Sequence, residues 1–169
     1  VLQKDAVIKP AKLKALINNT LSKLKKNRIS DGTATKKDIL KLVNKMQKSM
    51  SAIKKLEKKN SLQMKKRFQI YKKELDIKGK DLNMTDIFAT LGKSDINEEV
   101  VRFDSHLGLV ANLIKSKNNI GKKLDFYTQE MLRESNTMSS KALISEIKNE
   151  AVDIKSSIER MKEHAQNIE

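Results

Sequence analysis

Hydrophobic residues recur every three or four positions along most of this 169-residue chain, which is the spacing of α-helices. No stretch alternates hydrophobic and polar residues convincingly enough to predict a β-strand. Gly and Pro are rare, with five and one in the whole chain, so long helices can persist. We therefore predict an all-α fold in which long antiparallel helices form a bundle. The predicted helical segments are residues 11–27, 36–75, 82–91, 95–114, 121–141 and 142–168.

Turn residues separate the predicted helices. Asp31 and Gly32 interrupt the pattern between the first and second segments, and Gly79 lies in a turn before the third. Asp95 and Glu98 form an Asp-x-x-Glu variant of the capping box, which predicts the start of the fourth helix.

Two of the predicted helices need partners. A single helix over residues 36–75 would be about 60 Å long and could bury its apolar stripe only against other helices. The last segment, 142–168, repeats apolar residues at alternating spacings of three and four from Ile144 to Ile168. This is the heptad pattern of a packed helical seam. The sequence leaves open whether the partner of this seam lies in the same chain or in a second subunit.

The charge is distributed unevenly along the chain. Residues 1–75 contain 22 Lys and Arg against 5 Asp and Glu, a net charge of +17, whereas residues 76–169 contain 14 against 16, a net charge of −2. The basic half favours a polyanionic partner such as nucleic acid, and a solvated Lys-rich surface is the alternative. We predict two domains, a basic long-helix region over residues 1–92 and a C-terminal helical domain over residues 93–169.

Two absences narrow the classes of protein. Cys is absent, which excludes disulfides and thiolate metal sites and is compatible with a cytoplasmic protein. The chain has no run of about 18 apolar residues, so the sequence predicts no membrane span.

The segment GKKLDFYTQEMLRESNTMSSK carries an aromatic residue on its polar face. Leu124 and Met131 belong to its apolar face, and Phe126 lies almost opposite them. Glu130 and Glu134, one helical turn apart, can direct two carboxylates toward one point, and carboxylates favour hard cations such as Mg²⁺ or Mn²⁺. The alternative is a surface helix with incidental i,i+4 pairs. Phe126 argues against that alternative, because a large aromatic side chain suggests that the outer face is also covered.

A line of polar residues follows one edge of the apolar stripe in the fourth segment. Asp95, Glu99, Arg102 and His106 are spaced so that all four share this edge of a helix. One interpretation is a chain of ion pairs within the helix. The other is a functional site in which Glu99 and His106 bind metal or transfer protons and Arg102 holds a phosphate.

Three stretches in chain order resemble the YicC-like family of bacterial endoribonucleases, namely DINEEVVRFDSHL, GKKLDFYTQEMLRESNTMSSK and the terminal KEHAQNIE. The resemblance implies cleavage of RNA, dependence on a divalent metal and assembly into a ring-like homo-oligomer such as a hexamer. It also implies an N-terminal domain, of which this chain would lack almost all. The chain departs from the family pattern at Lys122, Leu132, Ser139 and His164, where the family usually has Arg, Asn, Gly and Gln. His164 is most simply a surface residue or a C-terminal cap.

The resemblance and the residue patterns together define the candidate site. The candidate catalytic residues are His106, Glu130 and Glu134. The candidate RNA-binding residues are Arg102, Lys122, Lys123, Arg133 and Lys141. The candidate ligands of Mg²⁺ or Mn²⁺ are Glu99, Asp125, Glu130 and Glu134. The sequence thus favours a metal-dependent endoribonuclease of the cytoplasm that forms a homo-oligomer. A non-catalytic helical protein that binds RNA or acts as a scaffold is the alternative.

Overall fold

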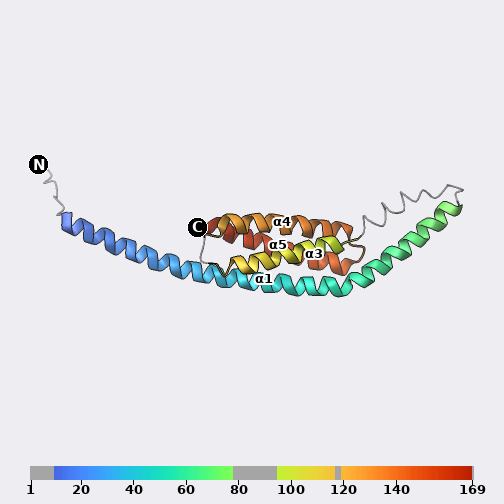
Figure 1. The fold of residues 1–169 in the computed structure, drawn as a ribbon, viewed down its shortest axis with the longest axis horizontal. Helices are drawn as coiled ribbons and strands as arrows, with labels where there is room; N and C mark the ends of the chain where they lie inside the picture. Colours follow the sequence, from blue (N-terminus) through green and yellow to red (C-terminus); the bar gives the residue numbers. More distant parts are fainter. Residues whose placement is uncertain (1–9, 78–94, 117–118, 169) are drawn as a thin grey trace, which may run out of the picture. The chain divides into compact units, whose positions relative to one another are not determined.

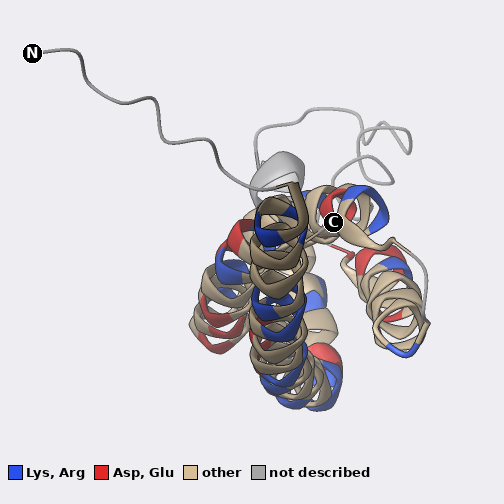
Figure 2. Cartoon of the chain, turned by 90° about the vertical axis from the view of Figure 1, so that its left-hand side faces the viewer, with Lys and Arg blue, Asp and Glu red and all other residues tan. Residues whose placement is uncertain are grey.

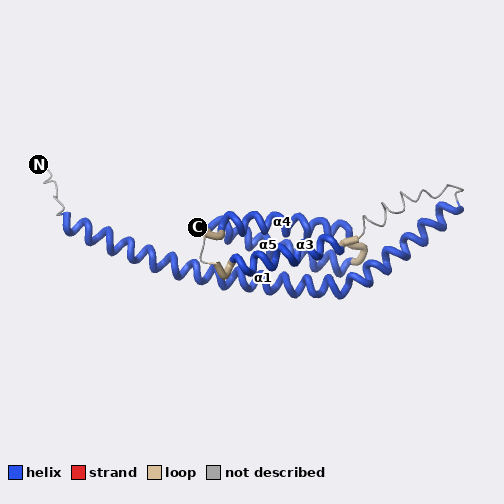
Figure 3. The backbone as a smooth tube through the Cα atoms, in the orientation of Figure 1, coloured by secondary structure: helices blue, strands red, loops and turns tan. Residues whose placement is uncertain are grey.

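The computed structural model describes residues 10–77, 95–116 and 119–168. Within these ranges the chain is helical and contains no strand, which confirms the all-α prediction (Figures 1 and 3). The helices are α1 (Pro10–Ile77), α3 (Asn97–Leu113), α4 (Gly121–Lys141) and α5 (Ser145–Asn167). The helix predicted over residues 82–91 and the turn at Gly79 lie outside the described residues. No helix among the described residues combines the length and the apolar character that crossing a membrane requires.

The chain forms two compact units, residues 1–38 and residues 39–169. In the first unit, α1 exposes an apolar stripe, with Leu16 and Ile29 64% and 63% exposed. Lys and Arg recur along α1 (Figure 2). The prediction of one domain over residues 1–92 and another over residues 93–169 stays a prediction.

Asp31 and Gly32 lie inside α1, so the turn predicted at this position is wrong. A Cβ atom added to Gly32 would meet nothing within 4 Å, and the neighbouring Thr33 hydroxyl donates a 2.8 Å hydrogen bond to the carbonyl oxygen of Ile29. A glycine in a helix costs only about 1 kcal/mol relative to alanine. That cost is too small to end a long helix by itself.

The second unit is a helical bundle in which residues 39–60 of α1 pack with α3, α4 and α5. These helices share one hydrophobic core, which includes Met46 from α1, Phe103 from α3, Met131 from α4 and Ile154 from α5. α4 runs antiparallel to α3 and to α5, because only short connections separate them in sequence (Figure 1). The long antiparallel helices predicted from the sequence are therefore confirmed.

The heptad seam of α5 finds its partners within this chain. Ile147, Ile154, Ile158 and Met161 are at most 1% exposed and belong to the core that α1, α3 and α4 share. The seam thus needs no second subunit to be buried, which answers the question that the heptad pattern left open.

The apolar stripe of α1 is buried only along part of its length. Met46, Met50 and Ile53 are at most 1% exposed, whereas Ile70 and Tyr71 are 58% and 42% exposed. A regular period therefore predicted the helix correctly but did not show where its packing partners end.

Close contacts at the ends of the helices fix the order of the bundle. A Cβ atom on Gly121, at the start of α4, would lie 2.3 Å from the carbonyl oxygen of Ile168, so only glycine allows this approach. At the start of α3, Asp95 Oδ1 accepts a 3.0 Å hydrogen bond from the Asn97 N–H, but the N-cap residue is Ile96 and no side chain caps the helix, so the predicted capping box is wrong. Glu98 forms an ion pair with Arg102.

Candidate active site

The polar edge of α3 faces α4, and its charged residues pair across the two helices. Lys141 Nζ of α4 lies 2.8 Å from Glu99 Oε1 of α3. One α3 turn further, Arg102 Nη1 lies 3.7 Å from Glu134 Oε1 of α4, and Arg102 also pairs with Glu98 within α3. The line predicted from sequence is therefore a contact surface between helices, and its intrahelical ion pair joins Arg102 to Glu98, which lies outside the line.

Both carboxylates that take part in the interhelical pairs are buried. Glu99 is 7% exposed and Glu134 is 5% exposed, whereas the side chain of Arg102 is 56% exposed. A buried carboxylate without a cation would be strongly unfavourable, so Lys141 and Arg102 account for the position of both acids. The guanidinium of Arg102 is thus accessible to solvent and is also paired with the buried carboxylate of Glu134.

Two buried polar atoms near this surface have no hydrogen-bond partner among the described residues. They are Glu99 Oε2 and His106 Nδ1. Such atoms are rare in folded proteins, and a native exception often marks a strained or functional position. Both belong to residues that the sequence singled out for chemistry.

The rings of His106, Tyr127 and Phe126 form a row. The ring of His106 lies 6.2 Å from the ring of Tyr127, with 40° between their planes. Tyr127 in turn meets Phe126 edge to face, at 5.6 Å and 67°. Tyr127 is partly buried against the core, and Phe126 is 57% exposed. The row therefore connects the polar edge of α3 to the outer face of α4.

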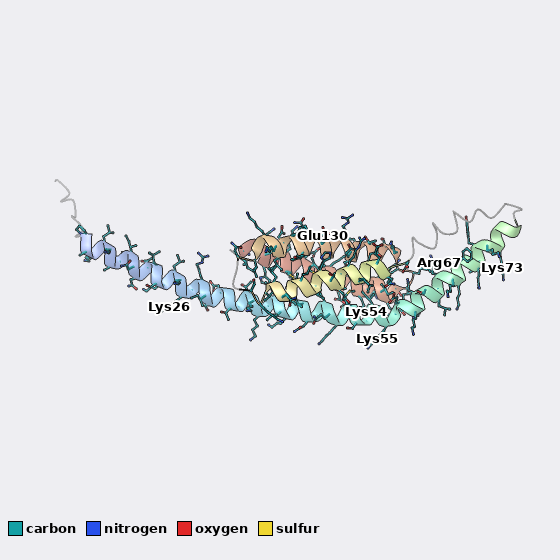
Figure 4. All side chains as sticks on the ribbon, viewed as in Figure 1. Lys26, Lys54, Lys55, Arg67, Lys73 and Glu130 are labelled. Atoms are coloured by element: carbon teal, nitrogen blue, oxygen red, sulfur yellow. The ribbon has the colours of Figure 1, made fainter. Side chains whose placement is uncertain are left out.

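The outer face of α4 carries the remaining candidates. Lys122, Lys123 and Arg133 are exposed there, and their role in binding RNA stays a prediction. Glu130 is half-buried and lies on the opposite side of the bundle from Lys55 of α1 (Figure 4).

The four predicted metal ligands do not form one cluster. Glu99 and Glu134 face cations, and Asp125 Oδ2 accepts a 2.8 Å hydrogen bond from Gln129 Nε2. Across the part of the chain that the structure describes, no group of three or more His, Asp or Glu residues is placed to hold a metal ion. The described residues of a single chain thus do not form a metal site from their own side chains. The binding of a divalent cation stays a prediction.

Sequence reasoning missed three ion pairs that join α1 to the rest of the bundle. Lys45 pairs with Asp153 at 3.4 Å, and Lys54 pairs with Asp104. Each lysine belongs to a segment where Lys covers most of the polar face, so nothing in its spacing separates it from its solvated neighbours.

The third pair joins Lys59 to Glu146 at 2.5 Å, near the start of α5. The hydrogen bond from Lys59, followed by bonds from the backbone of Glu146 and from Ser145, lowers the pKa of Glu146 from 4.5 to about 2. Next to this pair, the Asn60 side-chain oxygen accepts a 2.8 Å hydrogen bond from the Leu143 N–H in the connection between α4 and α5.

Comparison with known proteins decides the family. The family model described as "Endoribonuclease YicC-like, C-terminal" matches residues 47–169. The chain belongs to the YicC-like endoribonuclease family. The matched region contains α3, α4 and α5 and therefore the whole candidate site.

Two curated YicC relatives support the same assignment. The protein named "Probable endoribonuclease YicC" from Clostridioides difficile is 49% identical over 77 residues, which cover 46% of this chain and 26% of that protein. The protein of the same name from Haemophilus influenzae is 43% identical over 75 residues, which cover 44% of this chain and 26% of that protein. The chain thus matches about a quarter of the length of each relative.

Proposed function

We propose that this YicC-like chain takes part in the endonucleolytic cleavage of RNA and that the α3–α4 surface forms the site. The observation that carries the proposal is the position of the family-matched region around Arg102, His106 and two buried carboxylates. The family name and the names of the relatives support the reaction class.

The geometry suggests a role for each group. Arg102 is exposed and is held by Glu134, so its guanidinium can bind a phosphate in a fixed orientation. His106 is suited to accept or donate the proton that cleavage moves, because an imidazole ring can act both as a proton acceptor and as a proton donor. Glu130, half-buried on the same helix as Glu134, is the second candidate for proton transfer.

The Lys-rich half of the chain, residues 1–75, supports the part of the proposal that concerns the binding of RNA. A surface that neutralises phosphates releases counterions from RNA, so its affinity should fall steeply as salt rises. Lys122, Lys123 and Arg133 on α4 would continue this attraction next to the site.

Two further parts of the proposal come from the family resemblance. The first is a divalent cation, Mg²⁺ or Mn²⁺, which would stabilise charge on the phosphate and activate the attacking group. No step is assigned to it, because the described residues of one copy do not gather its ligands. The second is a homo-oligomer, in which a neighbouring copy could contribute groups to the site.

RNA shortening is the direct test. The purified protein is incubated with a labelled single-stranded RNA in the presence of Mn²⁺, Mg²⁺ or EDTA, and the products are separated by length. Internal cleavage that stops with EDTA is the expected result. Tight binding of RNA without any shortening in Mg²⁺ or Mn²⁺ would overturn the proposal in favour of a non-catalytic RNA-binding scaffold.

A further inference from the structure

Phe126 is a large aromatic residue on an otherwise polar helix face. Phe126 is 57% exposed. The structure describes the whole of α4, and Phe126 is the only large hydrophobic residue of this helix that is exposed. The apolar face of α4 is buried without Phe126, because Leu124 and Met131 fill it and are fully buried. The core therefore does not explain why a phenyl ring stands on the outer side of α4.

The ring of Phe126 is held in place from one side. Tyr127 packs against the core and meets the ring of Phe126 edge to face, with 67° between the planes. This geometry is favourable for aromatic pairs and leaves a face of the Phe126 ring open to solvent. An anchored ring loses little conformational freedom when a second flat group stacks on it.

The neighbours of Phe126 toward the start of α4 are cationic, and those toward its end are an amide and a carboxylate. Lys122 and Lys123 precede it by four and three residues, so both belong to its surroundings on the helix. Both are exposed, and neither ammonium has an ion-pair partner in the part of the chain that the structure describes. Gln129 and Glu130 follow by three and four residues, and the Gln129 side-chain amide donates a hydrogen bond to the carboxylate of Asp125. Asp125 is thus engaged and Glu130 is half-buried, while both ammonium groups are open to an anion.

This combination fits a nucleotide better than a protein surface. Stable protein interfaces bury roughly 800 Å² on each partner, with apolar side chains gathered at their centre. Phe126 instead stands alone among charged and amide side chains. An aromatic ring bordered by cations is the usual arrangement for single-stranded nucleic acid, whose bases stack on the ring while Lys binds the phosphates.

We propose that Phe126 stacks on an unpaired base of the RNA and that Lys122 and Lys123 bind the phosphates beside that base. The inference rests on the proposed function in RNA cleavage and adds a preference for single-stranded over duplex substrate. Because Tyr127 contacts both Phe126 and His106, stacking would set the position of the RNA relative to the candidate catalytic residues.

A tryptophan reporter tests the stacking directly. The chain contains no Trp, so Phe126→Trp introduces a single indole, and Val152→Trp places one at a control position that is 60% exposed on α5. Both variants are titrated with a non-cleavable 2′-O-methyl RNA, either single-stranded or as a duplex. We expect strong quenching of the indole at position 126 by the single strand and little by the duplex. Equal quenching at both positions would overturn the inference.

Affinity gives an independent readout. Phe126→Leu keeps an apolar side chain but removes the ring, and it should weaken single-strand binding about 5- to 150-fold, as expected for losing about 1–3 kcal/mol from one stacked base. Phe126→Trp should retain the affinity, and Val152→Ala should not change it. Unchanged affinity in Phe126→Leu would exclude stacking, while a wild type that cleaves RNA normally would leave the proposed function standing.

Two other results have distinct meanings. If the wild type binds no RNA at all, the proposed function fails together with the stacking. If Phe126→Leu leaves RNA affinity intact but lowers the mass of an oligomer in sedimentation, Phe126 is a contact between copies of the chain and the inference is wrong.

Discussion

Replacing Lys141 by Met would leave the carboxylate of Glu99 buried without a cation. Glu99 is 7% exposed, its Oε1 is paired with Lys141 at 2.8 Å, and its Oε2 already lacks a partner among the described residues. Breaking a buried ion pair from one side costs about 3–5 kcal/mol. The side chain of Lys141 is 26% exposed, so water compensates in part. We expect the free energy of unfolding to fall by about 2–4 kcal/mol.

Urea denaturation followed by far-UV circular dichroism measures this loss, with the m-value checked for constancy. The matched control is Lys45→Met, which breaks a pair whose side chains are 53% and 58% exposed. An exposed pair contributes roughly 0–1 kcal/mol, so the control should change stability little. The double variant Lys141→Met with Glu99→Leu should recover much of the loss, because it removes the unpaired charge together with its partner. The reasoning would be refuted if Lys141→Met were no more destabilising than Lys45→Met.

Three further predictions concern stability and titration. Gly121→Ala should lower stability by about 1–3 kcal/mol in thermal unfolding, because its methyl group would collide with the backbone oxygen of Ile168. An unchanged midpoint would contradict the close approach of α4 to the end of α5. Asn60→Leu should cost about 1–3 kcal/mol in urea, because it leaves a backbone N–H between α4 and α5 without its acceptor, and a neutral effect would argue against that role. The pKa of Glu146 should be about 2 in an NMR titration and return toward 4.5 in Lys59→Met. Since folding lowers this pKa, the contribution of Glu146 is present above pH 4.5 and disappears as the pH falls toward 2; a titration midpoint near 4.5 in the wild type would contradict the ion pair.

The hydrophobic period was enough to predict the helices, because burial requires apolar residues on one side of each helix. The seam of α5 illustrates this point, since Ile147, Ile154 and Ile158 are all buried. The turn at Asp31 and Gly32 was predicted wrongly because residue identity gives only a local preference, and a modest cost at one glycine does not end a long helix.

The candidate site was predicted in part. The spacing of Glu99, Arg102 and His106 placed them on one edge of a helix, and the structure brings that edge against α4. Which charge pairs with which could not be predicted, because the pairing of Glu134 with Arg102 depends on how far α4 is shifted along α3. Nothing in the sequence pattern encodes that shift directly. The roles of these residues in metal binding and catalysis stay predictions.

The rate of RNA cleavage by His106→Gln and Glu130→Gln tests the central claim most directly. The matched control is Glu159→Gln, which makes the same chemical change as Glu130→Gln at an exposed position of α5. All three variants are first checked for helical content and unfolding midpoint. The account predicts a loss of at least about 100-fold at His106, since general acid–base catalysis contributes about 10²–10⁴-fold, together with a large loss at Glu130 and a near-normal rate in the control. Folded His106→Gln and Glu130→Gln variants that cut RNA at the wild-type rate would contradict it.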